Sequence, residues 1–256
     1  MIEVKQLRKA FTQGQGKTKR TVQAVAGVDF TAADGRITGL LGPNGAGKTT
    51  TLRIAAALIT ADSGHVHVDG IDVAQRPAAA LARMGVLSDA RGLYPRLTAR
   101  ENIVYYGRLH GMAPAAAAAR AEALAHTLDM LPLLDRRTEG FSQGERMKTA
   151  LARALVHNPP NIVLDEPTNG LDVLATRALR DALRRLRDDE GKCIVFSTHI
   201  MQEVERLCDH VVVVAQGRTV AAGSVAELAT ASGETDFEET FVKLAFGPAA
   251  AHGGAA

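Results

Sequence analysis

The residues with the clearest chemical meaning form a glycine-rich run from Gly42 to Thr49. The run reads GPNGAGKT, fits the pattern G-x-x-x-x-G-K-[ST], and lies between an apolar stretch and a helical pattern. Its glycines let backbone N–H groups approach a phosphate, and the helix N-terminus behind them adds partial positive charge. Lys48 can place a full charge on the β- and γ-phosphates, and the Thr49 hydroxyl is a hard oxygen ligand for Mg²⁺. The run predicts a nucleoside triphosphate site; an ordinary glycine-rich turn is the alternative, which the motifs below disfavour.

Two carboxylates end a short apolar strand pattern further along the chain. The segment NIVLD at 161–165 is followed by Glu166 and by Pro167, which breaks the strand. In α/β folds such strand ends lie at the carboxyl edge of the sheet, where ligands bind. Asp165 is therefore a candidate to hold Mg²⁺, and Glu166 a candidate to orient and polarise an attacking water. Alternatively, Asp165 caps a turn and Glu166 is solvated, but a phosphate loop upstream favours the catalytic interpretation.

Composition describes the chain that must position these residues. It has 256 residues, of which 46% are apolar and 23% charged, so wholesale disorder is excluded. A net charge of +2, no tryptophan and 4% aromatics give no support for a nucleic-acid surface, so no nucleic-acid partner is expected. There is no apolar run of 18 residues, and the start, MIEVKQLRKAF, is not a secretory signal. Cys193 and Cys208 form no disulfide framework and are expected to be reduced thiols of a cytosolic protein.

The first third of the chain predicts strands around the phosphate loop. Apolar stretches at 2–7 and 22–30 flank GQGKTKR, which is typical of an exposed hairpin connection. Residues 36–42 form the strand before the loop, and residues 50–59 have the apolar spacing of the helix after it. The segment GHVHVDGIDV predicts a second hairpin with Asp69-Gly70 at its turn.

The rest of the chain separates into a helical middle and an alternating last third. From about 98 to 153 there is no convincing strand, and an alanine-rich helix begins near Pro114. Strands at 161–165, 192–198, 210–216 and 218–223 then alternate with helices at about 173–190 and 200–208, and the tail after Phe246 is expected to be frayed. This order predicts an α/β fold, with a mainly parallel sheet covered on both faces and an all-helical insertion.

Three stretches carry a family resemblance. The segment FSQGE at 141–145, followed by RMKTALARALVHNPP, looks like the L-S-G-G-Q signature of ATP-binding cassette proteins, and it lies shortly before the DEP strand end as that family requires. Together with the phosphate loop it resembles that family over about residues 1–225, and GLYPRLTARENI, FSQGE and EPTNGLD resemble bacterial export-type subunits, including sodium-efflux ones. The resemblance implies a P-loop NTPase core with an N-terminal antiparallel β part, a helical subdomain at about 90–155, and a short C-terminal helix and flexible tail at 226–256.

The signature departs from the family pattern at two positions. Gln143 replaces the first glycine and Glu145 replaces the glutamine, whereas Ser142 and Gly144 remain and would supply a hydroxyl and a close backbone approach to a γ-phosphate. Ser142 and Glu145 also fit an S-x-x-E capping box for the next helix. Both interpretations can hold, because a capped helix N-terminus is itself an anion site.

Other family positions are carried over by the same resemblance. Asp89 lies where the family has a glutamine and would face Mg²⁺ or water, although an exposed loop aspartate is equally compatible. Phe11 matches an adenine-stacking aromatic or packs in the core. Asp172 of Gly170-Leu171-Asp172 matches the D-loop or caps a helix. His199 matches the switch histidine that contacts the γ-phosphate. The implied ATP-binding set is Phe11, Gly42, Pro43, Asn44, Gly45, Ala46, Gly47, Lys48, Thr49, Thr50, Asp89, Ser142, Gln143, Gly144, Glu145 and Asp172. Thr49, Asp165 and Asp89 are the implied Mg²⁺ ligands, and Glu166 and His199 the implied catalytic residues.

The resemblance also implies a function. Two copies of such a cassette would clamp two ATP molecules head to tail and drive export of a small substrate or ion through a separate integral membrane permease. The chain would then be cytoplasmic and peripheral on the inner face of the cell membrane. The alternative is a soluble cassette ATPase that acts on ribosomes or DNA. Such proteins usually carry two cassettes, long inserts or a basic arm, none of which this sequence has.

Overall fold

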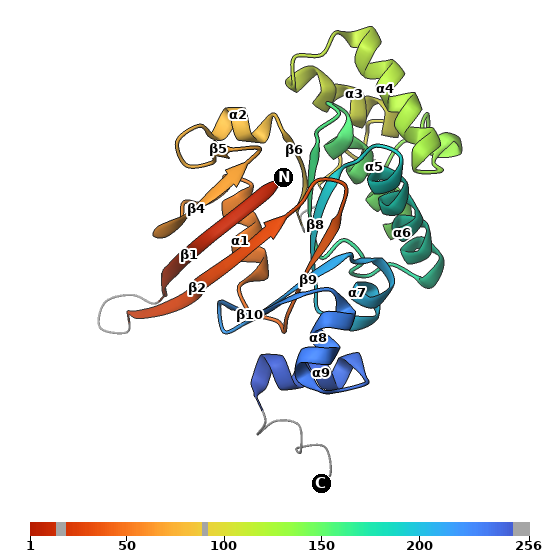
Figure 1. Ribbon diagram of the computed structural model, residues 1–256. Coiled ribbons are helices and arrows are strands. Elements are labelled where there is room, and N and C mark those ends of the chain that lie inside the picture. Colours follow the sequence, from red (N-terminus) through yellow and green to blue (C-terminus); the bar gives the residue numbers. More distant parts are fainter. Residues whose placement is uncertain (14–18, 89–91, 248–256) are drawn as a thin grey trace.

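The computed structural model describes residues 1–13, 19–88 and 92–247 (Figure 1). Within them, one ten-stranded sheet runs in the order β5-β4-β1-β2-β10-β9-β3-β8-β7-β6. The strands are β1 (Ile2–Gln13), β2 (Arg20–Ala32), β3 (Ile37–Leu41), β4 (Ser63–Val68), β5 (Ile71–Asp72), β6 (Met84–Leu87), β7 (Asn161–Asp165), β8 (Cys193–Thr198), β9 (His210–Ala215) and β10 (Arg218–Gly223).

Strands β9, β3, β8, β7 and β6 form the parallel part of the sheet. Every residue of β3, β7 and β8 is buried, as expected for parallel strands covered on both faces. On β7 and β8, Ile162, Leu164 and Phe196 pack toward α5 and α6, whereas Val163 and Val195 face the core around α1. The predicted mainly parallel, two-sided sheet is confirmed.

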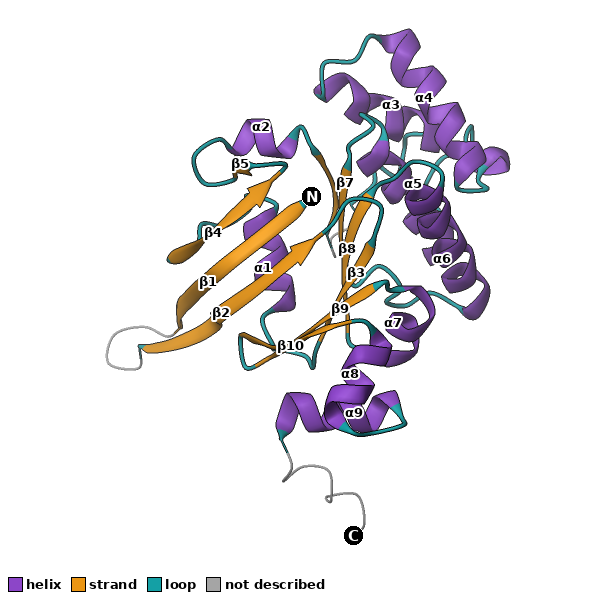
Figure 2. Cartoon of the chain, viewed as in Figure 1, coloured by secondary structure: helices purple, strands orange, loops and turns teal. Residues whose placement is uncertain are grey.

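Strands β5, β4, β1 and β2 form the antiparallel part, which confirms the predicted N-terminal β region (Figure 2). The hairpin predicted at Asp69-Gly70 is present between β4 and β5, and both turn residues have the left-handed φ that such turns require. The hairpin connection predicted between β1 and β2 falls largely on residues outside the described part of the chain.

The two parts of the sheet meet at β2 and β10, where a single register pair joins Gly27 to Arg218. Two further contacts lie beside this pair. The N–H of Ala26 donates to the carbonyl of Gly217 at 2.6 Å, and the Thr219 hydroxyl accepts from the Asp29 N–H and donates to the Asp29 carbonyl. A side-chain hydroxyl therefore supplements a short backbone ladder along this line.

Helices cover the sheet in three groups. Helix α1 (Lys48–Ala55) lies between the two parts of the sheet, and α2 (Pro77–Leu81) lies near β5 (Figure 1). The helical middle consists of α3 (Ala99–Leu109), α4 (Pro114–Thr127), a 3₁₀ turn (Leu131–Leu133) and α5 (Gln143–Leu155), followed after β7 by α6 (Val173–Asp188). Its β structure in the described residues is one isolated bridge, Thr98 with Arg137, so the predicted helical insertion is confirmed.

The C-terminal part differs in detail from the expectation. Beyond α7 (Met201–Leu207), the sequence predicts one short helix, whereas the structure has α8 (Val225–Ser232) and α9 (Phe237–Phe246). Gly233 ends α8 with a left-handed φ of 76°, and the Asp236 carboxylate caps α9. The tail that the sequence predicts to be frayed lies, after Gly247, outside the described residues. Among the described helices, none is long and apolar enough to cross a bilayer.

Candidate functional site

The loop between β3 and α1 requires glycine at two positions. A Cβ on Gly42 would lie 2.1 Å from the carbonyl oxygen of Val214, and one on Gly47 would lie 2.4 Å from that of Ala24. Gly47 also has a φ of 101°, in the left-handed region that side chains disfavour. The loop is therefore held tightly against β2 and β9, and its backbone geometry is fixed before any ligand arrives.

Lys48 begins α1 and turns its ammonium back onto this loop. Its side chain is 4% exposed, and Nζ donates to the carbonyl oxygens of Gly42 at 2.7 Å and Pro43 at 3.0 Å. Nζ also lies 4.0 Å from Oε1 of Glu166. Burial lowers the pKa of Lys48 from its ordinary value, and the negative charges of Glu166 and Asp165 oppose that shift. The loop thus surrounds a cation at the carboxyl edge of the sheet.

Asp165 ends β7 and accepts two hydrogen bonds at one carboxylate oxygen. Thr49 Oγ1 donates to Oδ1 at 3.0 Å, and Ser197 Oγ donates to the same atom at 2.6 Å. Ser197 is the register partner of Asp165 on β8 and also accepts from the Glu166 N–H at 3.0 Å. Sequence reasoning missed Ser197, although the polar Ser-Thr pair that ends the apolar run KCIVF was a signal for it.

Glu166 follows β7 with a φ of 44°, in the left-handed region that costs a residue other than glycine about 1 kcal/mol or more. The hydrogen bond from its N–H to Ser197 holds it there. Its Oε1 lies 3.4 Å from Nδ1 of His199, which follows β8. The structure therefore brings Lys48, Glu166 and His199 together, three residues that the sequence predicted from separate motifs.

A cavity of about 310 Å³ adjoins the loop and has Glu166 in its wall. Phe11 from β1 lies on this cavity and is 38% exposed, with Lys9 Nζ 5.7 Å from its ring centroid. This position favours a ligand-facing ring over a core-packing one. The remaining wall includes residues on β2 that the sequence did not single out, and it is made up of Val22, Gln23, Ala24, Asn44, Gly45, Ala46, Gly47, Lys48, Thr49 and Thr50.

The signature segment lies elsewhere in the molecule. Ser142 caps α5, its hydroxyl accepting from the Glu145 N–H while the Glu145 carboxylate accepts from the Ser142 N–H, so the predicted capping box is confirmed. Helices α5 and α1 lie apart, with the parallel strands between them (Figure 1). The structure therefore does not bring FSQGE to the phosphate loop within one chain.

Residues of this segment contact the loop that precedes α6. A Cβ added to Gly170 would lie 2.6 Å from Nε2 of Gln143, and one added to Gly144 would lie 2.9 Å from Cβ of Ala175. The Asp172 carboxylate accepts from the Ala175 N–H at 2.7 Å, which confirms the predicted cap of α6. Asp89 lies outside the described residues.

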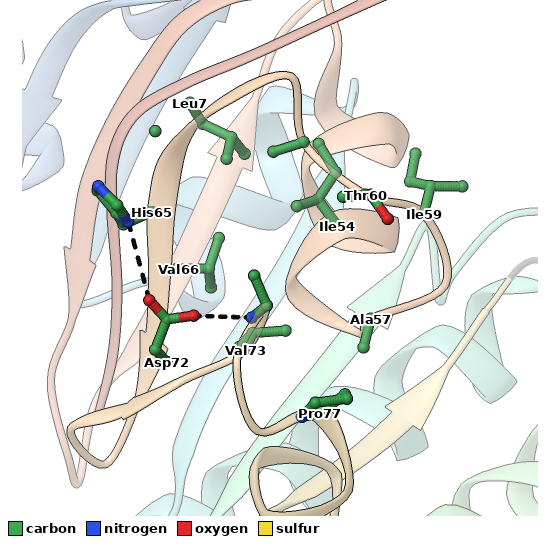
Figure 3. A pocket seen from close by; sticks show the side chains of 13 residues that line it. Leu7, Ile54, Ala57, Ile59, Thr60, His65, Val66, Asp72, Val73 and Pro77 are labelled. Carbon is green, nitrogen blue, oxygen red and sulfur yellow. Dashed lines mark hydrogen bonds and ion pairs between the residues drawn. The ribbon is translucent and has the colours of Figure 1, made fainter.

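A smaller cavity of about 170 Å³ lies beyond the C-terminal end of α1 (Figure 3). Its wall is mainly apolar, with the Asp72 carboxylate 3.8 Å from Nδ1 of His65 and accepting from the Ala74 N–H at 2.8 Å. None of the site residues predicted from the sequence lies in this wall, so the cavity is not part of the site described above.

Comparisons with known proteins agree with this geometry. A family model described as "ABC transporter" matches residues 25–169. The ABC transporter ATP-binding protein NatA of Bacillus subtilis (strain 168) is 41% identical over 225 residues, 88% of this chain and 91% of that protein. The Nod factor export ATP-binding protein I of Paraburkholderia xenovorans (strain LB400) is 39% identical over 217 residues, 85% of this chain and 71% of that protein.

Two solved structures share the fold. The dimeric bacterial ABC transporter cassette MJ0796 superposes with a TM-score of 0.78 at 25% identity, covering 88% of this chain and 98% of that one. An ATP binding subunit of an ABC transporter gives a TM-score of 0.80 at 28% identity, covering 95% and 98%. These relatives support the transporter interpretation rather than the ribosome- or DNA-directed alternative. The chain belongs to the ABC transporter family and is an ATP-binding, ATP-hydrolysing cassette of that family.

Proposed function

We propose that this cassette hydrolyses ATP between two copies of the chain and thereby powers export through a separate membrane permease. The observation that carries the proposal is that the catalytic residues and the signature segment lie apart within one chain. Lys48, Asp165, Glu166 and His199 gather at one sheet edge, whereas Ser142 caps a helix away from them. A second copy, placed head to tail, would bring its Ser142 to the γ-phosphate held by the first, and the dimeric form of MJ0796 supports this arrangement.

Binding of ATP would use groups that are already in position. The N–H groups of the loop and the Lys48 ammonium would hold the β- and γ-phosphates, with Lys48 exchanging its contacts to the Gly42 and Pro43 carbonyls for phosphate oxygens. Phe11, on the wall of the same cavity, would stack on the adenine. Little rearrangement is required, because the loop is already fixed by its neighbours.

The residues present fit a magnesium ion. The Thr49 hydroxyl and the Asp165 carboxylate are hard oxygen donors that lie 3.0 Å apart, the type of ligand that Mg²⁺ prefers. Thr49 would hold the ion directly and Asp165 would hold it directly or through water, while Ser197 keeps that carboxylate oriented. When bound, the ion would neutralise charge on the phosphate oxygens.

Glu166 is the proposed catalytic carboxylate. Its Oε1 lies 4.0 Å from the Lys48 ammonium and 3.4 Å from Nδ1 of His199, so both groups can help to orient it. It would orient the attacking water and accept a hydrogen bond from it, while His199 fixes the carboxylate and contacts the γ-phosphate. Gln143 of the signature, and Asp172, which follows the Gly170 that Gln143 adjoins, would complete the site from the second copy.

The partners and location follow from the same proposal. Residues 1–225 would form the cassette, and the helical part at about 90–155, with α3 and the segment before it, would dock the permease. Relatives named for Nod factor export and for linearmycin resistance support export. The chain would then lie in the cytoplasm against the inner face of the membrane. The substrate is selected by the permease.

The test uses Glu166→Gln, which keeps the shape of the side chain and removes its charge. Hydrolysis should fall by about 10²–10⁴-fold, and ATP, but not ADP, should produce a dimer detected by light scattering. Adding Ser142→Arg should abolish that dimer, because bulk and charge would enter the contact with the phosphate. Glu205→Gln, an exposed carboxylate on α7, is the matched control and should hydrolyse ATP at the parental rate.

Two results would contradict the proposal. Parental hydrolysis by the Glu166→Gln variant would remove the catalytic role of that residue. A stalled variant that stays monomeric with ATP at high protein concentration would contradict the shared site.

A further inference from the structure

Besides the cavity of about 310 Å³ beside the phosphate loop, called the nucleotide cavity, a second cavity, of about 320 Å³, adjoins the proposed catalytic pair. His199 lies in its wall, whereas Glu166 lies in the wall of the nucleotide cavity. Oε1 of Glu166 and Nδ1 of His199 are 3.4 Å apart, so a wall residue of one cavity contacts a wall residue of the other at this pair. A product formed at Glu166 is therefore separated from the second cavity by one pair of side chains.

The wall of the second cavity carries two arginines, Arg180 from α6 and Arg206 from α7. In the part of the chain that the structure describes, no carboxylate lies within 4 Å of either guanidinium, which distinguishes them from Arg184 and Arg187 of α6. Arg184 pairs with Asp181, and Arg187 pairs with two aspartates. The positive charge at the cavity is thus not neutralised by an ion pair.

The acidic residue in this wall is Glu203. It is 6% exposed, and its carboxylate accepts a hydrogen bond from the buried Thr198 hydroxyl at 2.8 Å. Two guanidiniums against one carboxylate leave the wall with net positive charge, before any proton on His199 is counted. Thr176 and Gln202 add a hydroxyl and an amide to the same wall. Such a set of donors suits a small, multiply charged oxyanion.

We propose that this cavity binds inorganic phosphate, the product released at Glu166. The inference rests on the proposed function, because hydrolysis supplies the phosphate. Guanidinium groups recognise tetrahedral phosphate oxygens by charge-assisted hydrogen bonds, and Arg180 and Arg206 reach the cavity from two different helices. Phosphate can therefore leave the nucleotide past His199 while ADP still occupies the loop.

The experiment measures binding of inorganic phosphate to nucleotide-free protein by titration calorimetry. Because the phosphate loop itself binds phosphate, the titrations are made in a Lys48→Ala background, which disables the loop and leaves the second cavity intact. Phosphate binding should persist in that background. It should weaken by at least about tenfold when Arg180→Gln and Arg206→Gln are added, since two charge-assisted contacts are lost.

The matched control is Arg177→Gln with Arg185→Gln, two exposed arginines on α6 that are outside the cavity wall. It removes the same charge and should bind phosphate as the Lys48→Ala background does. If the double substitution impairs folding, the single variant Arg206→Gln takes its place, because the Arg206 side chain is exposed and lies outside the core.

A second measurement is the inhibition of ATP hydrolysis by added phosphate in proteins that keep Lys48. Phosphate should inhibit ATP hydrolysis less strongly in the Arg180→Gln/Arg206→Gln variant than in the parent or the control. The inference is overturned if the Lys48→Ala background takes up no phosphate, or if the arginine variants bind phosphate as tightly as their control. Absence of hydrolysis in the parent would instead contradict the proposed function, so the two failures are distinguishable.

Discussion

The imidazole rings of His110 and His157 stack face to face, with centroids 3.7 Å apart and planes inclined by 6°. His110 ends α3 and His157 follows α5, and Nε2 of His157 donates to the carbonyl oxygen of Met84 on β6 at 3.1 Å. The stack thus links the helical part to the sheet. Burial, with a smaller contribution from His110, lowers the pKa of His157 to about 4, and burial also lowers the pKa of His110.

This stack predicts a loss of stability in mild acid. Between the ordinary histidine pKa of about 6.5 and the folded value of about 4, the unfolded chain binds a proton that folded His157 does not. The free energy of unfolding should therefore fall as the pH falls through this range, by up to about 3 kcal/mol from this residue. Denaturant unfolding at a series of pH values measures it. His157→Gln should flatten the dependence, whereas His126→Gln, an exposed histidine on α4, should leave it unchanged.

Lys48→Ala should greatly weaken ATP binding. Loss of a charge-assisted contact to a desolvated phosphate costs roughly 2–5 kcal/mol, or tens- to thousands-fold in affinity. Equilibrium titration with a fluorescent ATP analogue measures the change. Lys5→Ala removes an exposed lysine paired with Glu3 and should bind as the parent does. Equal affinity in the Lys48 and Lys5 variants would exclude this loop as the phosphate site.

Ser197→Ala should slow hydrolysis and raise the magnesium concentration needed for half-maximal rate. The change removes the hydrogen bond to Asp165 Oδ1 and the acceptor for the Glu166 N–H. Loss of a group that orients a metal ligand typically costs 10–100-fold. Steady-state rates at varied Mg²⁺ test this. Ser63→Ala, at an exposed position on β4, is the control, and a Ser197 variant with its magnesium dependence unchanged would show that Asp165 needs no such support.

Gly47→Ala should destabilise the chain more than Gly35→Ala. Both glycines have positive φ, and placing alanine there costs roughly 1–2 kcal/mol. At Gly35 the new Cβ meets open space, whereas at Gly47 it lies 2.4 Å from the Ala24 carbonyl oxygen, a backbone atom of β2. Denaturant midpoints compare the two variants, and equal losses would mean that the loop can move away from β2.

The sequence was most informative where chemistry and secondary structure coincide locally. Asp165 and Glu166 directly follow an apolar strand, and Lys48 directly precedes a helix, so their sheet-edge location was predictable. Ser197 was missed because its partner Asp165 lies 32 residues away and is set by the register of β7 against β8. The polar Ser-Thr strand end marks a candidate position, but the local pattern does not tell which residue it pairs with across the sheet.

Helix ends were also less predictable than helix existence. The apolar spacing after the phosphate loop predicts a helix to Ile59, but α1 ends at Ala55, and Ala57 adopts a left-handed φ of 54° before β4. Helix propensity alone does not reveal where tertiary packing turns the chain. For Asp89 the role implied by the family resemblance stays a prediction.

The join between β2 and β10 is a line of the sheet that few strand-to-strand hydrogen bonds cross. One register pair, the hydrogen bond from Ala26 to Gly217 and the Thr219 hydroxyl bridge this line, whereas β1 and β2 share a long ladder. Apolar side chains also span this line, because Val25 and Val28 of β2 belong to the same buried cluster as Val212 and Val214 of β9. Displacement of the antiparallel part would therefore disturb two walls of the nucleotide cavity together, because Phe11 lies on that cavity and the phosphate loop packs against β2 where Gly47 meets Ala24.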